Sequence, residues 1–98
     1  MPADKRIRHQ RAAHRDLLDI WQYTRRTWNE DQADSYLIEI DRTIRGIAAG
    51  ELIGTPHEYQ YRKRRVKAHV IFYRENDSEI VIIRVLHVRM DVARHLPG

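Results

Sequence analysis

The chain has 98 residues, 33% of them charged, no cysteine and a mean hydropathy of −0.70, which predicts one small, strongly ionic domain, residues 1–98, with a modest core. The absence of cysteine excludes disulfides, thiolate catalysis and thiolate metal sites. Because the sequence shows neither a signal peptide nor an apolar run of membrane-spanning length, we expect a soluble, cytoplasmic protein. Residues 1–56 carry nine Lys and Arg against nine Asp and Glu, and residues 57–98 carry nine against five, so the net charge of +4 lies in the C-terminal half and favours an acidic partner or a nucleic acid.

The first half of the chain is typical of two amphipathic helices. Apolar residues recur at three- and four-residue steps from Ala12 to Trp28, and again over about Glu30 to Ala49. Asn29 can cap the second helix, with Gln32 completing a capping box, and Gly50 is a natural left-handed end. Since the break between the helices is so short, we expect an antiparallel helical hairpin.

Four apolar residues of these helices are expected to have two different roles. Trp21 and Trp28 fall on the apolar stripe of the first helix, which predicts that both pack in the core. Leu18 and Ile38 fall roughly 100° from the stripes of their helices, where a lone monomer would prefer polar residues. These two side chains therefore suggest an interface with a partner.

After a breaker segment at residues 50–56 the apolar period falls to two, as strands require. Three strands are predicted: one formed by Tyr59, Tyr61 and the basic run at residues 62–67, a second at residues 68–74 and a third at residues 79–87. A polar turn over residues 75–78 is predicted between the last two. A short segment at residues 6–9 could add an edge strand. The resulting order, β-α-α-β-β-β, predicts an α+β fold in which the helical hairpin packs on one face of a small antiparallel sheet.

The strand at residues 79–87 alternates in a way that leaves both of its faces apolar. Two helices can cover only one side of such a sheet. The second face is therefore left for a partner, for the C-terminal tail or for another copy of the chain.

Most catalytic chemistries find no support in the sequence. The serines, Ser35 and Ser78, have no glycine elbow around them, and the glycines match no phosphate-binding motif. His9 and His14 are the only histidines close in sequence and are expected on different elements, so we expect no metal site. Helix carboxylates such as Asp16 are interpreted as partners of neighbouring arginines on the same helix.

One constellation could cleave a phosphodiester: Arg65, Arg84 and His87, with arginines to hold phosphate and a histidine for acid-base catalysis. Arg84 and His87 are three residues apart, so in an unbroken strand they point to opposite faces. Only a bulge or the end of the strand could bring them together.

Three stretches together resemble one known family: residues 16–36 (DLLDIWQYTRRTWNEDQADSY), 68–74 (AHVIFYR) and 81–96 (VIIRVLHVRMDVARHL). They are similar to the ParE branch of the ParE/RelE toxin superfamily of type II toxin-antitoxin systems. The resemblance implies a RelE-like fold, a ParD-type antitoxin as partner, a role in plasmid stabilisation and poisoning of DNA gyrase without bond chemistry by the toxin. The run VLHVRMD, with no tyrosine after Arg84, is the ParE-like form.

On this basis the sequence predicts two binding surfaces and no catalytic residue. The target-contacting tail is assigned to Arg89, Met90, Arg94 and His95. Antitoxin binding is assigned to Leu18, Ile38, Arg62 and Arg64. No cofactor, metal, small-molecule substrate or membrane is expected.

Two alternatives remain open. A RelE-like mRNA endonuclease acting on the ribosome would use Arg65, Arg84 and His87. A noncatalytic nucleic-acid-binding module would use the basic strand and the helical hairpin, although the second helix is acidic where a recognition helix would be basic.

Overall fold

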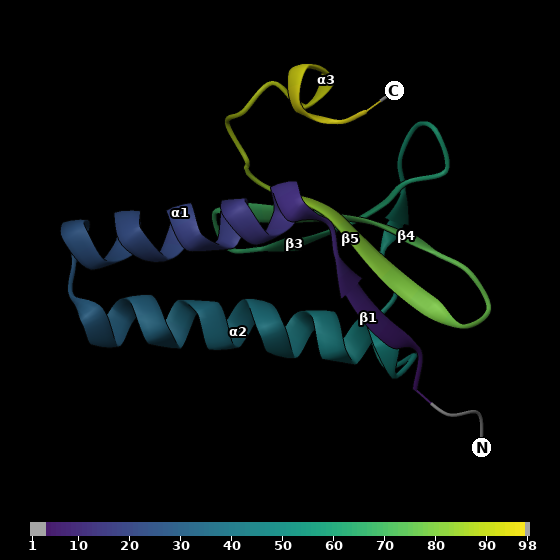
Figure 1. Ribbon diagram of the computed structural model, residues 1–98, viewed down its shortest axis with the longest axis horizontal. Coiled ribbons are helices and arrows are strands. Elements are labelled where there is room, and N and C mark those ends of the chain that lie inside the picture. Colours follow the sequence, from purple (N-terminus) through teal and green to yellow (C-terminus); the bar gives the residue numbers. More distant parts are fainter. Residues whose placement is uncertain (1–3, 98) are drawn as a thin grey trace.

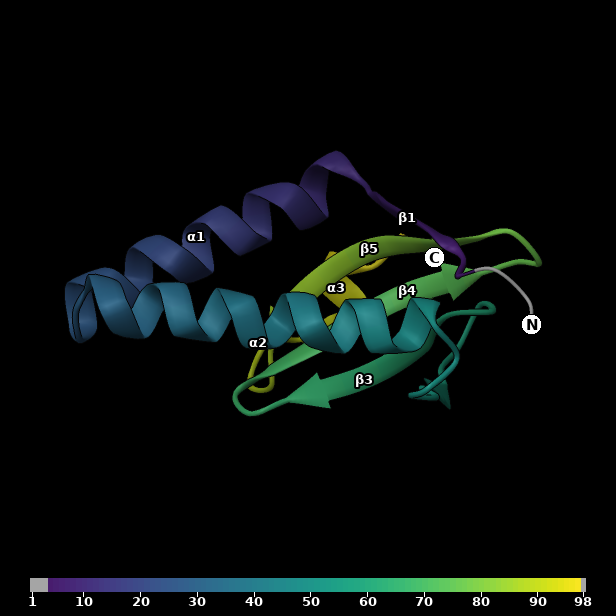
Figure 2. The same cartoon turned by 90° about the horizontal axis from the view of Figure 1, so that it is seen from below.

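A computed structural model describes residues 4–97, in which a helical hairpin is stacked on a five-stranded sheet (Figure 1). The elements are β1 (Arg6–His9), α1 (Arg11–Thr27), α2 (Glu30–Ala48), β2 (Thr55–Pro56), β3 (Arg62–Val66), β4 (His69–Glu75), β5 (Glu79–His87) and α3 (Val92–His95). Seen from the hairpin side, α2 runs in front of β3 and β4 while α3 lies behind the sheet (Figure 2). The α+β class and the helical hairpin are confirmed.

The sheet has the strand order β1-β5-β4-β3-β2 and is mixed, whereas a purely antiparallel sheet was predicted. The strand β1 runs parallel to β5, with Ile7 beside Ile80, and the other pairs are antiparallel. Only Gln10 separates β1 from α1, so the direction of β1 is tied to the helix that it must enter. The short elements β2 and α3 were not predicted.

The start of α2, its end and the turn before β5 lie where the sequence predicted them. The Asn29 side chain accepts a hydrogen bond of 2.8 Å from the backbone N–H of Gln32, which caps α2. Gly50 follows α2 with a φ of 77°, the left-handed conformation that glycine adopts without strain. At the turn before β5, the Asn76 side chain accepts bonds from the backbone N–H groups of Ser78 and Glu79.

The main core lies between the hairpin and the sheet. From the helices it takes Ile20, Ile40 and Ile44, which pack against Ile71 and Ile82 of β4 and β5. Each of these side chains is buried, and together they fix how the hairpin sits on the sheet.

The two tryptophans differ from the prediction and from each other. Trp28 is 72% exposed, so its assignment to the core was wrong. The helix α1 ends at Thr27 and Trp28 is its C-cap, with a φ of −120° and a ψ of −87°, so the helical stripe does not reach it. Trp21 is partly buried and joins the two helices, because its indole N–H donates to an Asp34 carboxylate oxygen at 2.9 Å.

The second face of the sheet is covered in part by the tail. Tyr61, Val81 and Ile83 form a small cluster there, and Leu96 packs against it. The Tyr61 hydroxyl also donates to the backbone oxygen of Pro97. Of the three occupants that the sequence left open, the structure places the chain's own tail on this face.

Among the helices of residues 4–97, none has the length and apolar character that crossing a membrane requires.

Candidate functional site

Two adjoining cavities, of about 400 and 280 Å³, lie between the helical hairpin and the sheet, where β4 begins and β5 ends. Both are lined by Tyr23 of α1, His69 of β4 and His87 of β5. We call this the histidine cleft. The larger cavity has the volume of a small ligand pocket, and polar side chains from α1, β4 and β5 converge on it.

The centre of the histidine cleft is a contact between three ionisable side chains from three elements. The Tyr36 hydroxyl of α2 lies 2.6 Å from His69 Nδ1 and donates to the Val66 carbonyl at 3.0 Å. The His69 and His87 rings meet edge to face, with their centroids 5.3 Å apart. Burial raises the pKa of Tyr36, so its hydroxyl stays protonated at neutral pH.

The environment of His69 keeps this imidazole uncharged at neutral pH. Burial lowers the pKa of His69 to about 4, the nearby His87 lowers it further, and Asp16 opposes them by raising it. The cleft therefore presents an imidazole that can donate or accept a hydrogen bond but carries no charge at pH 7.

One side of the cleft is fixed by an ion pair that joins α1, β5 and the tail. Asp16 accepts two hydrogen bonds from the Arg84 guanidinium, at 2.7 and 2.8 Å, and one of 2.9 Å from the backbone N–H of Val85. A further Arg84 N–H donates to the His95 carbonyl at 2.9 Å, and the Asp16 bonds raise the pKa of Arg84. The interpretation of Asp16 as a partner of arginines on its own helix was wrong, because its partner lies 68 residues away.

Arg84 and His87 lie on opposite faces of β5, and Arg65, on β3, donates from its guanidinium to the Lys67 carbonyl at 2.7 Å. The register shift between β4 and β5 lies between the pair Phe72 with Arg84 and the pair Tyr73 with Ile82. From Arg84 to His87 the pairing is regular, so successive side chains still alternate between the two faces of the sheet. His87 accordingly contacts His69 on the hairpin side, while Arg84 bonds to the tail.

The tail residues differ in how far they reach into solvent. The Arg94 side chain is 82% exposed and lies 3.5 Å from Asp91, and Met90 is 46% exposed and lines the histidine cleft. Arg89 is exposed, and its backbone N–H donates to His87 Nδ1 at 3.1 Å. His95 is partly buried, since its carbonyl is held by Arg84.

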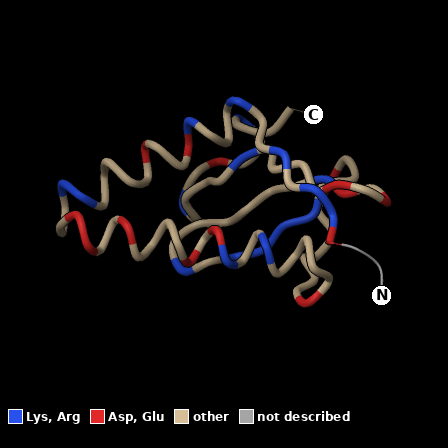
Figure 3. The backbone as a smooth tube through the Cα atoms, turned by 60° about the horizontal axis from the view of Figure 1, so that its bottom comes forward, with Lys and Arg blue, Asp and Glu red and all other residues tan. Residues whose placement is uncertain are grey.

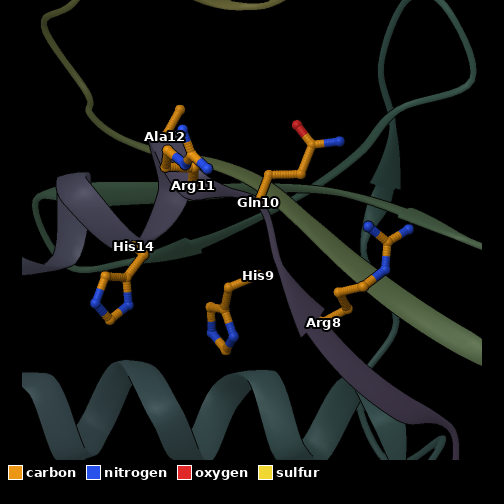
Figure 4. A pocket seen from close by; sticks show the side chains of 6 residues that line it. All are labelled: Arg8, His9, Gln10, Arg11, Ala12 and His14. Carbon is orange, nitrogen blue, oxygen red and sulfur yellow. The ribbon is translucent and has the colours of Figure 1, made fainter.

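A second group of titratable residues surrounds the junction of β1 and α1 (Figure 4). His9 and His14 lie on different elements, as expected, yet both rings point toward α2, whereas Arg8 points away from it. Burial lowers the pKa of His9, Asp41 raises it and His14 lowers it. Within residues 4–97 no three side chains are grouped in a way that could hold a metal ion.

Comparison with known proteins decides the family. The family model described as "ParE toxin of type II toxin-antitoxin system, parDE" matches residues 7–92. The chain belongs to the ParE toxin family. It is 40% identical over 95 residues to "Toxin ParE1" of Caulobacter vibrioides, covering 94% of this chain and 98% of that protein. It is also 40% identical over 89 residues to "Toxin ParE1" of Mycobacterium tuberculosis, covering 87% of this chain and 91% of that protein.

The fold of this ParE-family chain also matches a solved structure. That structure, "Chromosomal ParDE TA system from P. aeruginosa", superposes with a TM-score of 0.76 at 20% sequence identity, covering 87% of this chain and 97% of the other. The family and the fold predicted from the sequence are therefore confirmed.

The residues assigned to antitoxin binding fall into two groups in this ParE-family structure. Leu18 and Ile38 are each 51% exposed, as their positions predicted. Arg62 and Arg64 instead hold the loop after α2, since their guanidinium groups donate to the carbonyls of Gly54 and Ile53 at 2.9 and 3.2 Å. The apolar pair is thus available to a partner, while the two arginines already have partners within the chain.

Proposed function

We propose that this ParE-family chain is the toxin of a type II toxin-antitoxin pair, that a ParD-type antitoxin neutralises it, and that it inhibits DNA gyrase without breaking a covalent bond itself. The observation that carries the proposal is the family match over residues 7–92. Relatives from three organisms, named as ParE toxins, support it along most of their own length.

The arrangement of the basic side chains favours this proposal over an mRNA endonuclease. A phosphodiester-cleaving site needs cations and an acid-base group that converge on one phosphate. The Arg84 guanidinium is already bonded to Asp16 and to the tail, and His87 lies on the other face of β5. Such an Arg84 would have to leave its ion pair before it could hold a phosphate.

The charge distribution also disfavours a module that binds nucleic acid through the hairpin. Acidic side chains mark the first half of α2, while lysines and arginines gather on β1, at the start of α1 and on β3 (Figure 3). A helix that enters a DNA groove needs the opposite charge.

Two assays separate the gyrase and ribosome targets: DNA supercoiling by purified gyrase, and mRNA cleavage on translating ribosomes. The variants are Arg89→Ala with Arg94→Ala, which removes the exposed charges of the tail, and His87→Gln, which removes acid-base capacity. Arg42→Ala is the control, because Arg42 is also an exposed arginine but lies on α2. These point variants leave Leu96 and the His95 carbonyl in place, so the second face of the sheet stays covered.

We expect the parent to inhibit supercoiling, the double variant to need about tenfold more protein for the same effect, and His87→Gln and Arg42→Ala to match the parent. Cleaved mRNA with normal supercoiling would contradict the proposal. If His87→Gln also abolished that cleavage, the endonuclease would replace gyrase inhibition as the function.

A further inference from the structure

We infer that the histidine cleft binds an arginine side chain from the antitoxin segment that covers the toxin. The identity of the partner rests on the function proposed above. The chemistry of the side chain that fits depends on the lining of the cleft alone.

The larger cavity of the cleft suits a long side chain with an apolar stem. Ile20, Val85 and Met90 supply apolar surface to its lining, and Tyr23, which is 63% exposed, lies at the same cavity. An arginine stem can bury its methylene groups on such a surface while its charged end remains near solvent. A phenol ring beside it offers a face on which a guanidinium can stack.

The carboxylates that line the cleft favour the binding of a cation. Asp16 is occupied by Arg84, and Glu39 pairs with Lys67 at 3.0 Å. Asp19, on α1, also lines the larger cavity, and within residues 4–97 it forms no ion pair. Asp19 is therefore the carboxylate with which an incoming cation would pair.

The His69 imidazole does not offset the charge of Asp19. His69 is uncharged at neutral pH because burial lowers its pKa to about 4. In His87, the Nδ1 atom accepts a hydrogen bond of 3.1 Å from the backbone N–H of Arg89, so this nitrogen already has a partner within the chain. The cleft thus combines the Asp19 carboxylate, which forms no ion pair within residues 4–97, with an uncharged His69 imidazole.

Among cations, arginine fits better than lysine. A guanidinium is planar, pairs with a carboxylate through two parallel N–H bonds and stacks on aromatic rings, whereas an ammonium is a compact and strongly hydrated charge. The chain as a whole has a net charge of +4 and so attracts an acidic segment. A single basic side chain would therefore anchor an antitoxin segment that is acidic elsewhere.

Two tripeptide probes test the cleft directly: acetyl-Leu-Arg-Leu-amide and its citrulline analogue, which has nearly the same shape but no charge. Binding is followed by NMR through the ring protons of His69 and His87. We expect the arginine probe to shift these signals and to bind about tenfold more tightly than the citrulline probe. Asp19→Asn should remove that difference, while Asp77→Asn, the same change at an exposed turn outside the cleft, should keep it.

Equal binding of the two probes, binding of neither, or an unchanged preference in Asp19→Asn would overturn the inference. The proposed function is tested apart from it, by co-purification of the toxin with the product of the reading frame beside its gene. If that complex forms and Asp19→Asn and Tyr23→Ala leave its affinity unchanged, the antitoxin pairs elsewhere and only the inference fails. If the parent forms no complex while the probes behave as expected, the cleft stands and the antitoxin assignment fails.

Discussion

The Asp16 carboxylate joins α1 to β5 at one side of the histidine cleft. Its side chain is 12% exposed and that of Arg84 is 20% exposed, so both charges are largely removed from solvent. Asp16→Ala would leave the Arg84 guanidinium without its counterion and the Val85 N–H without its acceptor. We expect a loss of about 3 kcal/mol in the free energy of unfolding, measured by urea denaturation.

The matched control for this prediction is Asp19→Ala, three residues further along α1. Asp19 is exposed and forms no ion pair in residues 4–97, so its removal should change the free energy of unfolding by about 0.5 kcal/mol or less. Equal losses in the two variants would contradict the assigned role of the Asp16 bonds.

The lowered pKa of His69 predicts how stability depends on pH. An unfolded chain protonates this histidine near its ordinary value of 6.5, but the folded protein does so only near pH 4. Between these values the unfolded state binds more protons, so stability is fully present above pH 6.5 and falls as the pH is lowered toward 4.

Urea melts at several pH values check this, with His69→Gln as the test variant. The slope of stability against pH between 6.5 and 4 should be smaller in His69→Gln than in the parent. Part of the slope should persist, because burial also lowers the pKa of His9, and His9→Gln should remove a further share. An identical slope in the parent and in His69→Gln would exclude the proposed effect.

At the residue scale, sequence patterns predicted what is local and missed what is distant. The Asn29 cap and the Gly50 turn depend on neighbours within a few residues, and both are confirmed. The pairing of Asp16 with Arg84 spans 68 residues, and no spacing rule could indicate it. Trp28 was misplaced because periodicity does not tell at which residue a helix ends.

At the scale of elements, the tail is an integral part of the sheet's packing as well as a candidate contact surface. Leu96 packs on Tyr61, Val81 and Ile83, so Leu96→Ala would uncover apolar surface on the second face. We expect it to lower the free energy of unfolding by about 2 kcal/mol in a urea melt. Ala93→Ser, an exposed change in α3, is the control and should have almost no effect.

Long elements were predicted well, and short ones were not. The helices α1 and α2 have 17 and 19 residues, enough for their apolar period to be recognised. The elements β2 and α3 have two and four residues, which is too short for a period to be defined. Histidine positions in β4 and β5 were visible in the sequence, but the cleft between His69 and His87 required the register that pairs these strands.

At the scale of the whole molecule, we propose three exposed surfaces within residues 4–97 for contacts with partners. They are the outer side of the hairpin, with Leu18 and Ile38, the histidine cleft, and the charged tail with Arg94. The net charge of +4 should draw the proposed acidic antitoxin segment toward the chain, while buried apolar contacts should hold it there. The affinity of the complex should therefore depend more on the apolar surfaces than on the charges.

The pair Leu18→Glu and Ile38→Glu tests this directly. Both residues are 51% exposed, so the double variant should fold normally, and its unfolding by urea should match that of the parent. In the antitoxin complex the new carboxylates would lie against apolar anchors, and we expect the affinity to fall about 100-fold. Ile53→Glu is the matched control, since Ile53 is 75% exposed but lies on the loop after α2. Isothermal titration of the purified proteins measures the affinity, and if the double variant binds as tightly as the parent, the antitoxin does not use this side of the hairpin.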